Sequence, residues 1–198
     1  TQTLAHEFLS KGTATHGLVI IAQQQTQGIG RLRRNWHSPL GGLWMSVILK
    51  HPFPLDYFAG FSVRVGLAII TTLEALFPLN FKIKWPNDIF LTGKKNGGIL
   101  IELSSKGNHL ESLVCGIGLN VNNLAINLPL AVRGQSISIS EALGGRVVAL
   151  EEVRDAVLAA LARVLTELQK GTLSNLSTNW HNYSLTFNNP IKIACDNE

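Results

Sequence analysis

Four short β-rich runs follow one another between residues 81 and 122, with turn residues between them. They read FKIKW, IFLTG, GGILIELSS and SLVCGIGLNVN. The connections contain Pro-Asn-Asp, Gly-Lys-Lys and KGNHLE, which are typical of tight turns. Runs of this length with such short connections predict a meander of neighbouring strands. This meander constrains the fold more than any other feature, because helices must then pack around an existing sheet.

Helical periodicity marks segments on both sides of the meander. Residues 2–11 predict a short amphipathic helix that ends at Gly12, and residues 57–77 predict a buried helix that ends at Pro78. Residues 150–170 predict a long amphipathic helix with acidic residues in its first turn and Gly171 as C-cap. Further elements are expected as strands over 17–24, 43–50 and 190–194, and as a helix over 173–183.

These elements do not alternate between strand and helix, so they predict an α+β protein. We expect a mixed, largely antiparallel β-sheet with helices packed on it. The 198 residues are 45% hydrophobic, which suffices for one ordinary core plus an appendage. The chain opens on Thr1 and closes on a strand-like run followed by Asp-Asn, so we expect both ends to be cut.

Composition excludes several classes of protein. The most apolar segment carries Arg64 and Glu74, so no membrane helix is expected, and no signal peptide is visible. The net charge of +4 suits an anionic ligand but is modest for a dedicated nucleic-acid binder. Cys115 and Cys195 lack metal-binding spacing and are expected as free thiols in a reducing cytoplasm. The histidines are scattered without ligand spacing, so no metal site is predicted.

A glycine-rich, arginine-rich loop occupies residues 22–39, AQQQTQGIGRLRRNWHSP. Its backbone N–H groups could approach a phosphate while Arg31, Arg33 and Arg34 add charged hydrogen bonds. The loop matches neither the Walker pattern nor the dinucleotide pattern that opens a helix. Taken alone, it is equally consistent with a solvated turn.

Residues 84–88, KWPND, place Lys84 at a strand end just before a proline turn. Such a lysine is usually a solvated edge charge. Trp85 and Pro86 restrict the neighbouring backbone, however, and an ammonium held against apolar walls is a strong point charge for an anion. Downstream, GIGLNVNN at 116–123 has small residues that would let a flat ligand lie against the strand, or would simply allow close strand packing.

The segments QQQTQGIGRLRRNWHSP, KWPNDIFLTGKKNGGILIEL and CGIGLNVN, in this order, resemble the catalytic domain of biotin-protein ligases, also called biotin-[acetyl-CoA-carboxylase] ligases. The resemblance runs along the whole chain. It implies the fold shared by class II aminoacyl-tRNA synthetases and biotin ligases over residues 1–184, with residues 185–198 beginning a truncated SH3-like β domain.

Such ligases join biotin to ATP as biotinyl-5′-AMP and transfer the biotinyl group to a lysine of biotin carboxyl carrier protein. The resemblance thus implies a cytoplasmic enzyme that uses ATP, Mg²⁺ and biotin, with the carrier protein as partner and a possible homodimer. No helix-turn-helix segment precedes Thr1, so no nucleic-acid partner is expected. Two alternatives stay open: a lipoate or octanoate ligase or transferase of the same fold, and a non-catalytic basic nucleic-acid-binding module.

The resemblance also implies roles for individual residues. Lys84 and Arg31 are predicted to be catalytic, because they would neutralise the repulsion between the biotin carboxylate and the α-phosphate. The residues predicted to bind biotin are Thr1, Gln2, Gln25, Ile29, Gly30, Arg31, Trp36, Lys84, Gly98, Gly116 and Gly118. The residues predicted to bind ATP are Arg31, Arg34, Lys84, Lys95 and Asn120.

Two positions depart from the family pattern. Ile29 stands where the loop usually has an arginine, and Thr1-Gln2 stands where the family has the end of a Ser-Thr-Asn segment. Among the acids near KWPND are Asp88 and Glu102, which form no carboxylate cluster for a dedicated metal cage. Asp88 is expected to cap the proline turn.

Overall fold

Six strands form one antiparallel sheet in the computed structural model, which describes residues 1–50, 53–172 and 176–190. The order across the sheet is β1-β2-β6-β5-β4-β3. The predicted meander is confirmed, and each pair of adjacent strands runs antiparallel. The strands are β1 (Leu18–Ala22), β2 (Leu43–Leu49), β3 (Phe81–Lys84), β4 (Asp88–Leu91), β5 (Lys94–Lys106) and β6 (His109–Leu119).

The predicted helices are present, which confirms the α+β class. Helix α2 begins four residues later than expected, because a 3₁₀ turn, η2 (Leu55–Phe58), and the left-handed Gly60 (φ 68°) precede it. Two short helices after β6, α3 and α4, were not predicted. Ser138 and Glu141 form a capping box at the start of α4, which is a sequence pattern typical of a helix N-terminus. The helices are α1 (Gln2–Ser10), α2 (Phe61–Leu76), α3 (Leu130–Arg133), α4 (Ile139–Ala142), α5 (Leu150–Lys170) and α6 (Leu176–Tyr183).

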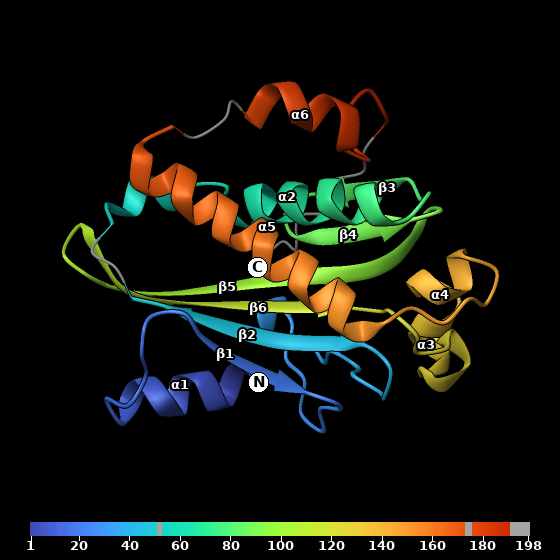
Figure 1. The fold of residues 1–198 in the computed structure, drawn as a ribbon, viewed down its shortest axis with the longest axis horizontal. Coiled ribbons are helices and arrows are strands. Elements are labelled where there is room, and N and C mark those ends of the chain that lie inside the picture. The colour runs from blue at the N-terminus through green and yellow to red at the C-terminus, as the bar shows by residue number, and fades with distance from the viewer. Residues whose placement is uncertain (51–52, 173–175, 191–198) are drawn as a thin grey trace, which may run out of the picture.

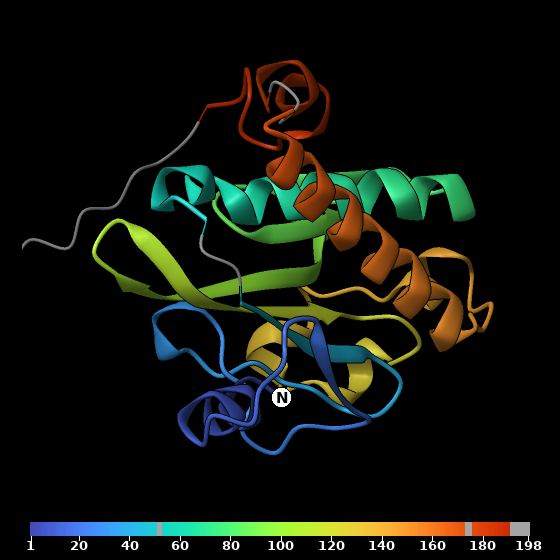
Figure 2. The ribbon, with the colours of Figure 1, turned by 60° about the vertical axis from the view of Figure 1, so that its left-hand side comes forward.

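Helices α2 and α5 cover one face of the sheet, and α1 lies against the opposite face (Figures 1 and 2). The long helix α5 buries a stripe that includes Val153, Val157 and Leu161 and ends at left-handed Gly171. Alternation along β2 separates the two faces. Val47 faces the main core, whereas Ile48 packs with Ala5 of α1.

The same alternation determines what the α1 face of the sheet carries. Register places Gly118 opposite both Trp44 and Gly98, and it places Gly116 opposite both Ser46 and Leu100. Directly opposed residues lie on the same face, so small residues from β5 and β6 adjoin each other on the side away from α2 and α5. This glycine-lined strip leaves room for other groups to lie directly on the sheet.

Several expectations concern buried or terminal residues. Cys115 is a buried free thiol as predicted, and burial raises its pKa to about 12. Cys195 and most of the strand expected at 190–194 lie outside the described residues. Leu185 N–H donates to the Ile83 carbonyl (2.9 Å), so the chain at 184–185 contacts the edge of β3. The domain boundary expected at 184/185 stays a prediction.

No helix in the described part of the chain is long and apolar enough to cross a membrane.

Candidate active site

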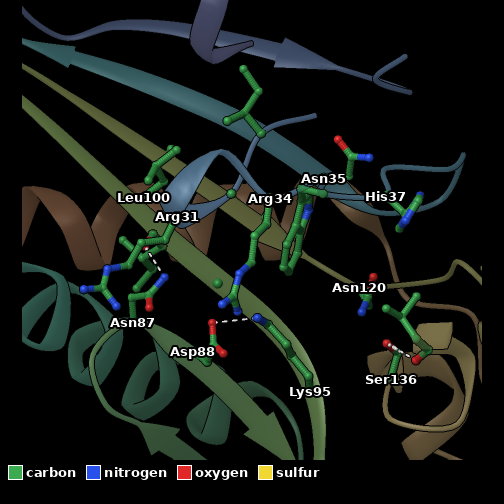
Figure 3. A pocket seen from close by; sticks show the side chains of 18 of the residues that line it. Arg31, Arg34, Asn35, His37, Asn87, Asp88, Lys95, Leu100, Asn120 and Ser136 are labelled. Carbon is green, nitrogen blue, oxygen red and sulfur yellow. Dashed lines mark hydrogen bonds and ion pairs between the residues drawn. The ribbon is translucent and has the colours of Figure 1, made fainter. Parts of the chain in front are cut away.

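A cavity of about 910 Å³ lies over the glycine-lined strip on the α1 face. The start of α1, the loop after β1, the turn between β3 and β4, and the segment around α3 surround it (Figure 3). Every residue that the sequence placed in the site lines this cavity. They are Thr1, Gln2, Gln25, Ile29, Gly30, Arg31, Arg34, Trp36, Lys84, Lys95, Gly98, Gly116, Gly118 and Asn120.

The indole of Trp36 lies on the glycine strip. A Cβ at Gly118 would stand 2.7 Å from Trp36 Nε1, and one at Gly98 would stand 3.5 Å from the same ring. The first distance is closer than real Cβ contacts, so Gly118 is required for the indole to lie this close to β6. Trp36 thereby forms one wall of the cavity.

Uncharged polar side chains occupy one end of the cavity. Thr1 Oγ1 donates to Gln25 Oε1 (3.1 Å), and Gln25 Nε2 donates to Ser38 Oγ (2.8 Å). Ser46 Oγ lies 2.8 Å from Thr1 Oγ1 and 2.9 Å from Gln2 Oε1. These side chains come from α1, the loop and β2, and their mutual bonds hold them in place before any ligand arrives. Ser46 was missed in the sequence, because a single serine in an apolar strand gives no local signal.

The arginine loop is a small hairpin closed by its own backbone bonds. Trp36 N–H donates to the Gly28 carbonyl (2.9 Å), and Gly30 N–H donates to the Arg34 carbonyl (2.8 Å). A Cβ at Gly28 would stand 2.2 Å from the Trp36 carbonyl oxygen, so only glycine fits there. The hairpin tip at η1 (Arg31–Arg33) bends through two residues of positive φ.

The hairpin directs its arginines differently. Arg31 and Arg34 line the cavity, and Arg34 extends toward the Asp88–Lys95 pair (Figure 3). Arg33 does not line it, and its charge instead lies near Glu102. Among the described residues, neither Arg31 nor Arg34 makes an ion pair.

Two lysines line the cavity on the side opposite the arginine hairpin. Lys95 Nζ pairs with Asp88 Oδ1 (2.7 Å) and lies 5.1 Å from the centre of the Trp36 ring. Lys84 is exposed, and its Nζ lies 5.6 Å from the ring of Phe90. Lys95 is therefore the lysine held inside the cavity, whereas Lys84 lies at its rim.

The turn between β3 and β4 is tied to its surroundings by residues other than those expected. The expectation that Asp88 caps this turn was wrong, because its carboxylate pairs with Lys95. Asn87 instead bonds Ile99 on β5 through both its side chain (3.0 Å) and its carbonyl (2.9 Å). Trp85 is 64% exposed and does not wall Lys84.

The segment before α4 forms the far wall, and buried Asn96 fastens it. Asn96 Nδ2 donates to the carbonyls of Asn120 (2.8 Å) and Ile137 (3.1 Å). Lys95 N–H donates to the Gln135 carbonyl (2.7 Å), which brings residues 134–136 beside Lys95. The sequence did not reveal this wall, because backbone bonds between distant segments leave no residue pattern.

The cavity thus joins a neutral hydrogen-bonding end to a cationic end. An elongated ligand with a polar head and an acid tail would match both ends. No group of three or more potential metal-ligating side chains occurs in the described ranges.

Comparison with known proteins places the chain in a family. Residues 1–120 match the model of the biotin/lipoate A/B protein ligase family. The chain belongs to this family. Its relatives include the bifunctional ligase/repressor BirA of Bacillus spizizenii, 40% identical over 130 residues that cover 65% of this chain and 40% of the relative. The biotin–[acetyl-CoA-carboxylase] ligase of Paracoccus denitrificans is 35% identical over 104 residues, which cover 52% of this chain and 43% of the relative.

Solved structures of ligases in this family share the fold. The biotin protein ligase of Aquifex aeolicus in complex with biotin and ATP superposes with a TM-score of 0.77 at 28% identity, covering 91% of this chain and 74% of that one. The Leishmania major ligase with biotinyl-5-AMP gives a TM-score of 0.72 at 21% identity, covering 100% and 82%, and this likeness concerns the fold alone. The chain spans about two-fifths of the length of the Bacillus relative.

Proposed function

We propose that this chain activates biotin with ATP as biotinyl-5′-AMP and transfers the biotinyl group to a lysine of biotin carboxyl carrier protein. The observation that carries the proposal is the single cavity that joins a prearranged neutral end to a cationic end. Membership of the biotin/lipoate A/B protein ligase family supports the same chemistry. The homologous ligase of Aquifex aeolicus, solved with biotin and ATP, has the same fold.

The neutral end favours biotin over lipoate or octanoate. A biotin head carries a cyclic urea with two N–H donors and a carbonyl acceptor, which Thr1, Gln2, Gln25 and Ser46 can pair. The dithiolane of lipoate and the methyl end of octanoate offer no such partners. These side chains already bond one another. Binding either acid would still leave their remaining hydrogen-bonding capacity unused and shielded from water, and sites of this kind reject such analogues strongly.

The cationic end serves the first chemical step. A biotin carboxylate oxygen attacks the α-phosphorus of ATP, a bond to that phosphorus forms, and pyrophosphate leaves. Both reactants are anionic, so fixed positive charge is needed where their oxygens approach. Lys95 is the best-placed group, because it is half-buried and held by Asp88 against Trp36. The catalytic role predicted for Lys84 and Arg31 stays a prediction, and we assign Lys95 to the same electrostatic centre as a further fixed charge.

The loop arginines and Asn120 complete the nucleotide side. Arg31 and Arg34 would bind phosphates as they enter, and Asn120 lies on the wall nearest to residues 134–136. ATP would enter with Mg²⁺, which neutralises part of its phosphate charge. In the second step the acceptor lysine amine attacks the acyl carbon, and AMP leaves.

The setting of the reaction follows from the proposed partner. We assign the chain to the cytoplasm, where the carrier protein of acetyl-CoA carboxylase would be its acceptor. A homodimer and the absence of a nucleic-acid partner stay predictions. Affinity for DNA or RNA that fell by orders of magnitude with added salt would favour the basic binding module instead.

The proposal is tested by incubating the protein with MgATP, biotin and a carrier domain, and then measuring the intact mass of the carrier. We expect one added biotinyl group per carrier, and none when the acceptor lysine is replaced by arginine. A carrier that stays unmodified while the protein is folded contradicts the proposal.

A further inference from the structure

Glu102 on β5 lies just outside the cavity, yet it contacts a side chain that lines it. Gln2 Nε2 donates to Glu102 Oε2 (2.7 Å) and, over a longer distance, to the Val114 carbonyl (3.5 Å). His6 Nε2 lies 2.7 Å from the same Glu102 oxygen. Gln2 is only 8% exposed and lines the neutral end. Glu102 therefore touches the site through Gln2 and does not line the cavity itself.

The charge of Glu102 determines which way the Gln2 amide points. Burial acts to raise the pKa of Glu102, but the hydrogen bonds from His6 and Gln2 and the nearby charges of His6 and Arg33 lower it below its usual value. Glu102 is thus a carboxylate at neutral pH and only accepts hydrogen bonds. The Gln2 nitrogen must then face Glu102, which turns its oxygen toward Ser46 and Gly116.

The Gln2 oxygen has spare capacity in this orientation. An amide oxygen carries two lone pairs, and the single hydrogen of the Ser46 hydroxyl occupies at most one of them. A Cβ at position 116 would stand 2.6 Å from this oxygen, so Gly116 leaves the space that the amide needs. The reversed amide would place an N–H group there, and two donors would then face each other when a ligand N–H arrives.

We propose that Glu102 is a positioning residue for ligand recognition, which holds Gln2 as a hydrogen-bond acceptor for an N–H donor on the head of the ligand. This inference rests on the proposed function, since a urea ring supplies that donor. His6 supports Glu102 from the next turn of α1, as both His6 and Gln2 bond the same carboxylate oxygen.

The test is steady-state adenylate formation by the Glu102→Gln variant, which keeps size and hydrogen-bonding capacity but removes the charge. The new amide can present either its oxygen or its nitrogen, so only the longer bond to the Val114 carbonyl (3.5 Å) still favours one orientation of the Gln2 amide. We expect the KM for biotin to rise about tenfold, the loss of a charged hydrogen bond, while kcat and the KM for ATP change less than about twofold.

A double-mutant cycle separates positioning from a general structural effect. Gln2→Met removes the amide at similar size, and Glu102→Gln should add less than about twofold to the KM for biotin in that background. The matched control is Glu111→Gln at the far end of the same strand pair, and its kinetics should equal wild type. Within the described residues, the side chain of Glu111 bonds only Ser104 (3.2 Å). Melting temperatures of all variants check the fold.

Three outcomes contradict the proposal in distinguishable ways. An active wild type with an unchanged Glu102→Gln variant overturns the inference alone. Independent, multiplicative effects of Glu102→Gln and Gln2→Met also overturn it, because Glu102 would then not act through Gln2. A folded wild type that forms no biotinyl adenylate overturns the proposed function and this inference together.

Discussion

The two ends of the cavity differ in what their polar groups do before a ligand arrives. At the neutral end, Thr1, Gln2, Gln25 and Ser46 already bond one another. At the cationic end, Arg31, Arg34 and Lys84 make no ion pair within residues 1–50, 53–172 and 176–190. The side chains of the first end are thus held by one another, whereas those of the second have charge available for an anion.

Lys95 links the two arrangements. It belongs to the cationic end, yet it already pairs with Asp88 and lies over the Trp36 ring. A charge that is fixed before the reaction stabilises developing charge without reorganisation. We therefore propose that Lys95 contributes to the rate, the exposed arginines to ATP affinity, and the neutral end to biotin affinity.

The largest effect is expected for Lys95→Met. Loss of the held charge should lower the adenylation rate about 10²–10³-fold, the range seen when one transition-state donor is removed. Single-turnover pyrophosphate release measures this rate, and Lys106→Met at the exposed far end of β5 serves as the control. A fall of less than about fivefold in a folded variant would remove Lys95 from the electrostatic centre.

Arg34→Ala and Arg33→Ala compare two arginines of the same hairpin by their effect on the KM for ATP. Arg34 lines the cavity and Arg33 does not, so the KM for ATP should rise about tenfold for Arg34→Ala and less than about twofold for Arg33→Ala. Initial rates across an ATP titration at saturating biotin measure both values. Equal rises in the two variants would mean that the loop attracts ATP by overall charge only.

Gly116→Ala disturbs the neutral end alone. The new Cβ would stand 2.6 Å from Gln2 Oε1, and the flexible Gln2 side chain would shift rather than the strand. We expect the KM for biotin to rise about fivefold, the equivalent of one neutral hydrogen bond, with the KM for ATP unchanged. Gly134→Ala, on the cavity wall beside Lys95, is the comparison variant. A Cβ added there would meet no heavy atom within 4 Å outside its chain neighbours, so the KM for biotin should not change. Equal changes in the KM for biotin and the KM for ATP would show that the two ends of the cavity do not bind their ligands separately.

The smallest effect concerns Ile29, which lines the cavity at the loop position where the resemblance to the family predicts an arginine. An exposed cation added by Ile29→Arg should slow release of biotinyl-5′-AMP about threefold, because surface ion pairs contribute less than about 1 kcal/mol. Rapid-quench release assays compare the variant with wild type, and Ile29→Met controls for size. Equal release rates would show that the missing charge has no role in retention.

Much of this arrangement could be predicted from local patterns. The turn-separated runs between residues 81 and 122 predicted the meander, and the predicted site residues converge on one cavity, because the motifs follow strand ends and loops on one face. The contacts that hold Lys95 inside the cavity could not be predicted. They depend on Asp88 and Trp36, which lie on a different strand and on a loop. The contacts of Ser46 and Glu102 with Gln2 could not be predicted for the same reason, because these residues are distant from Gln2 in the sequence.

We propose that the neutral end selects a urea-bearing acid for activation at the cationic end. The most direct measurement is kcat/KM for acyl-adenylate formation with biotin, lipoate and octanoate at saturating MgATP. We expect kcat/KM to be higher for biotin by about 10³-fold or more, because the other acids cannot hydrogen-bond the polar side chains of the neutral end. Equal values for the three acids, or a preference for lipoate or octanoate, would contradict it.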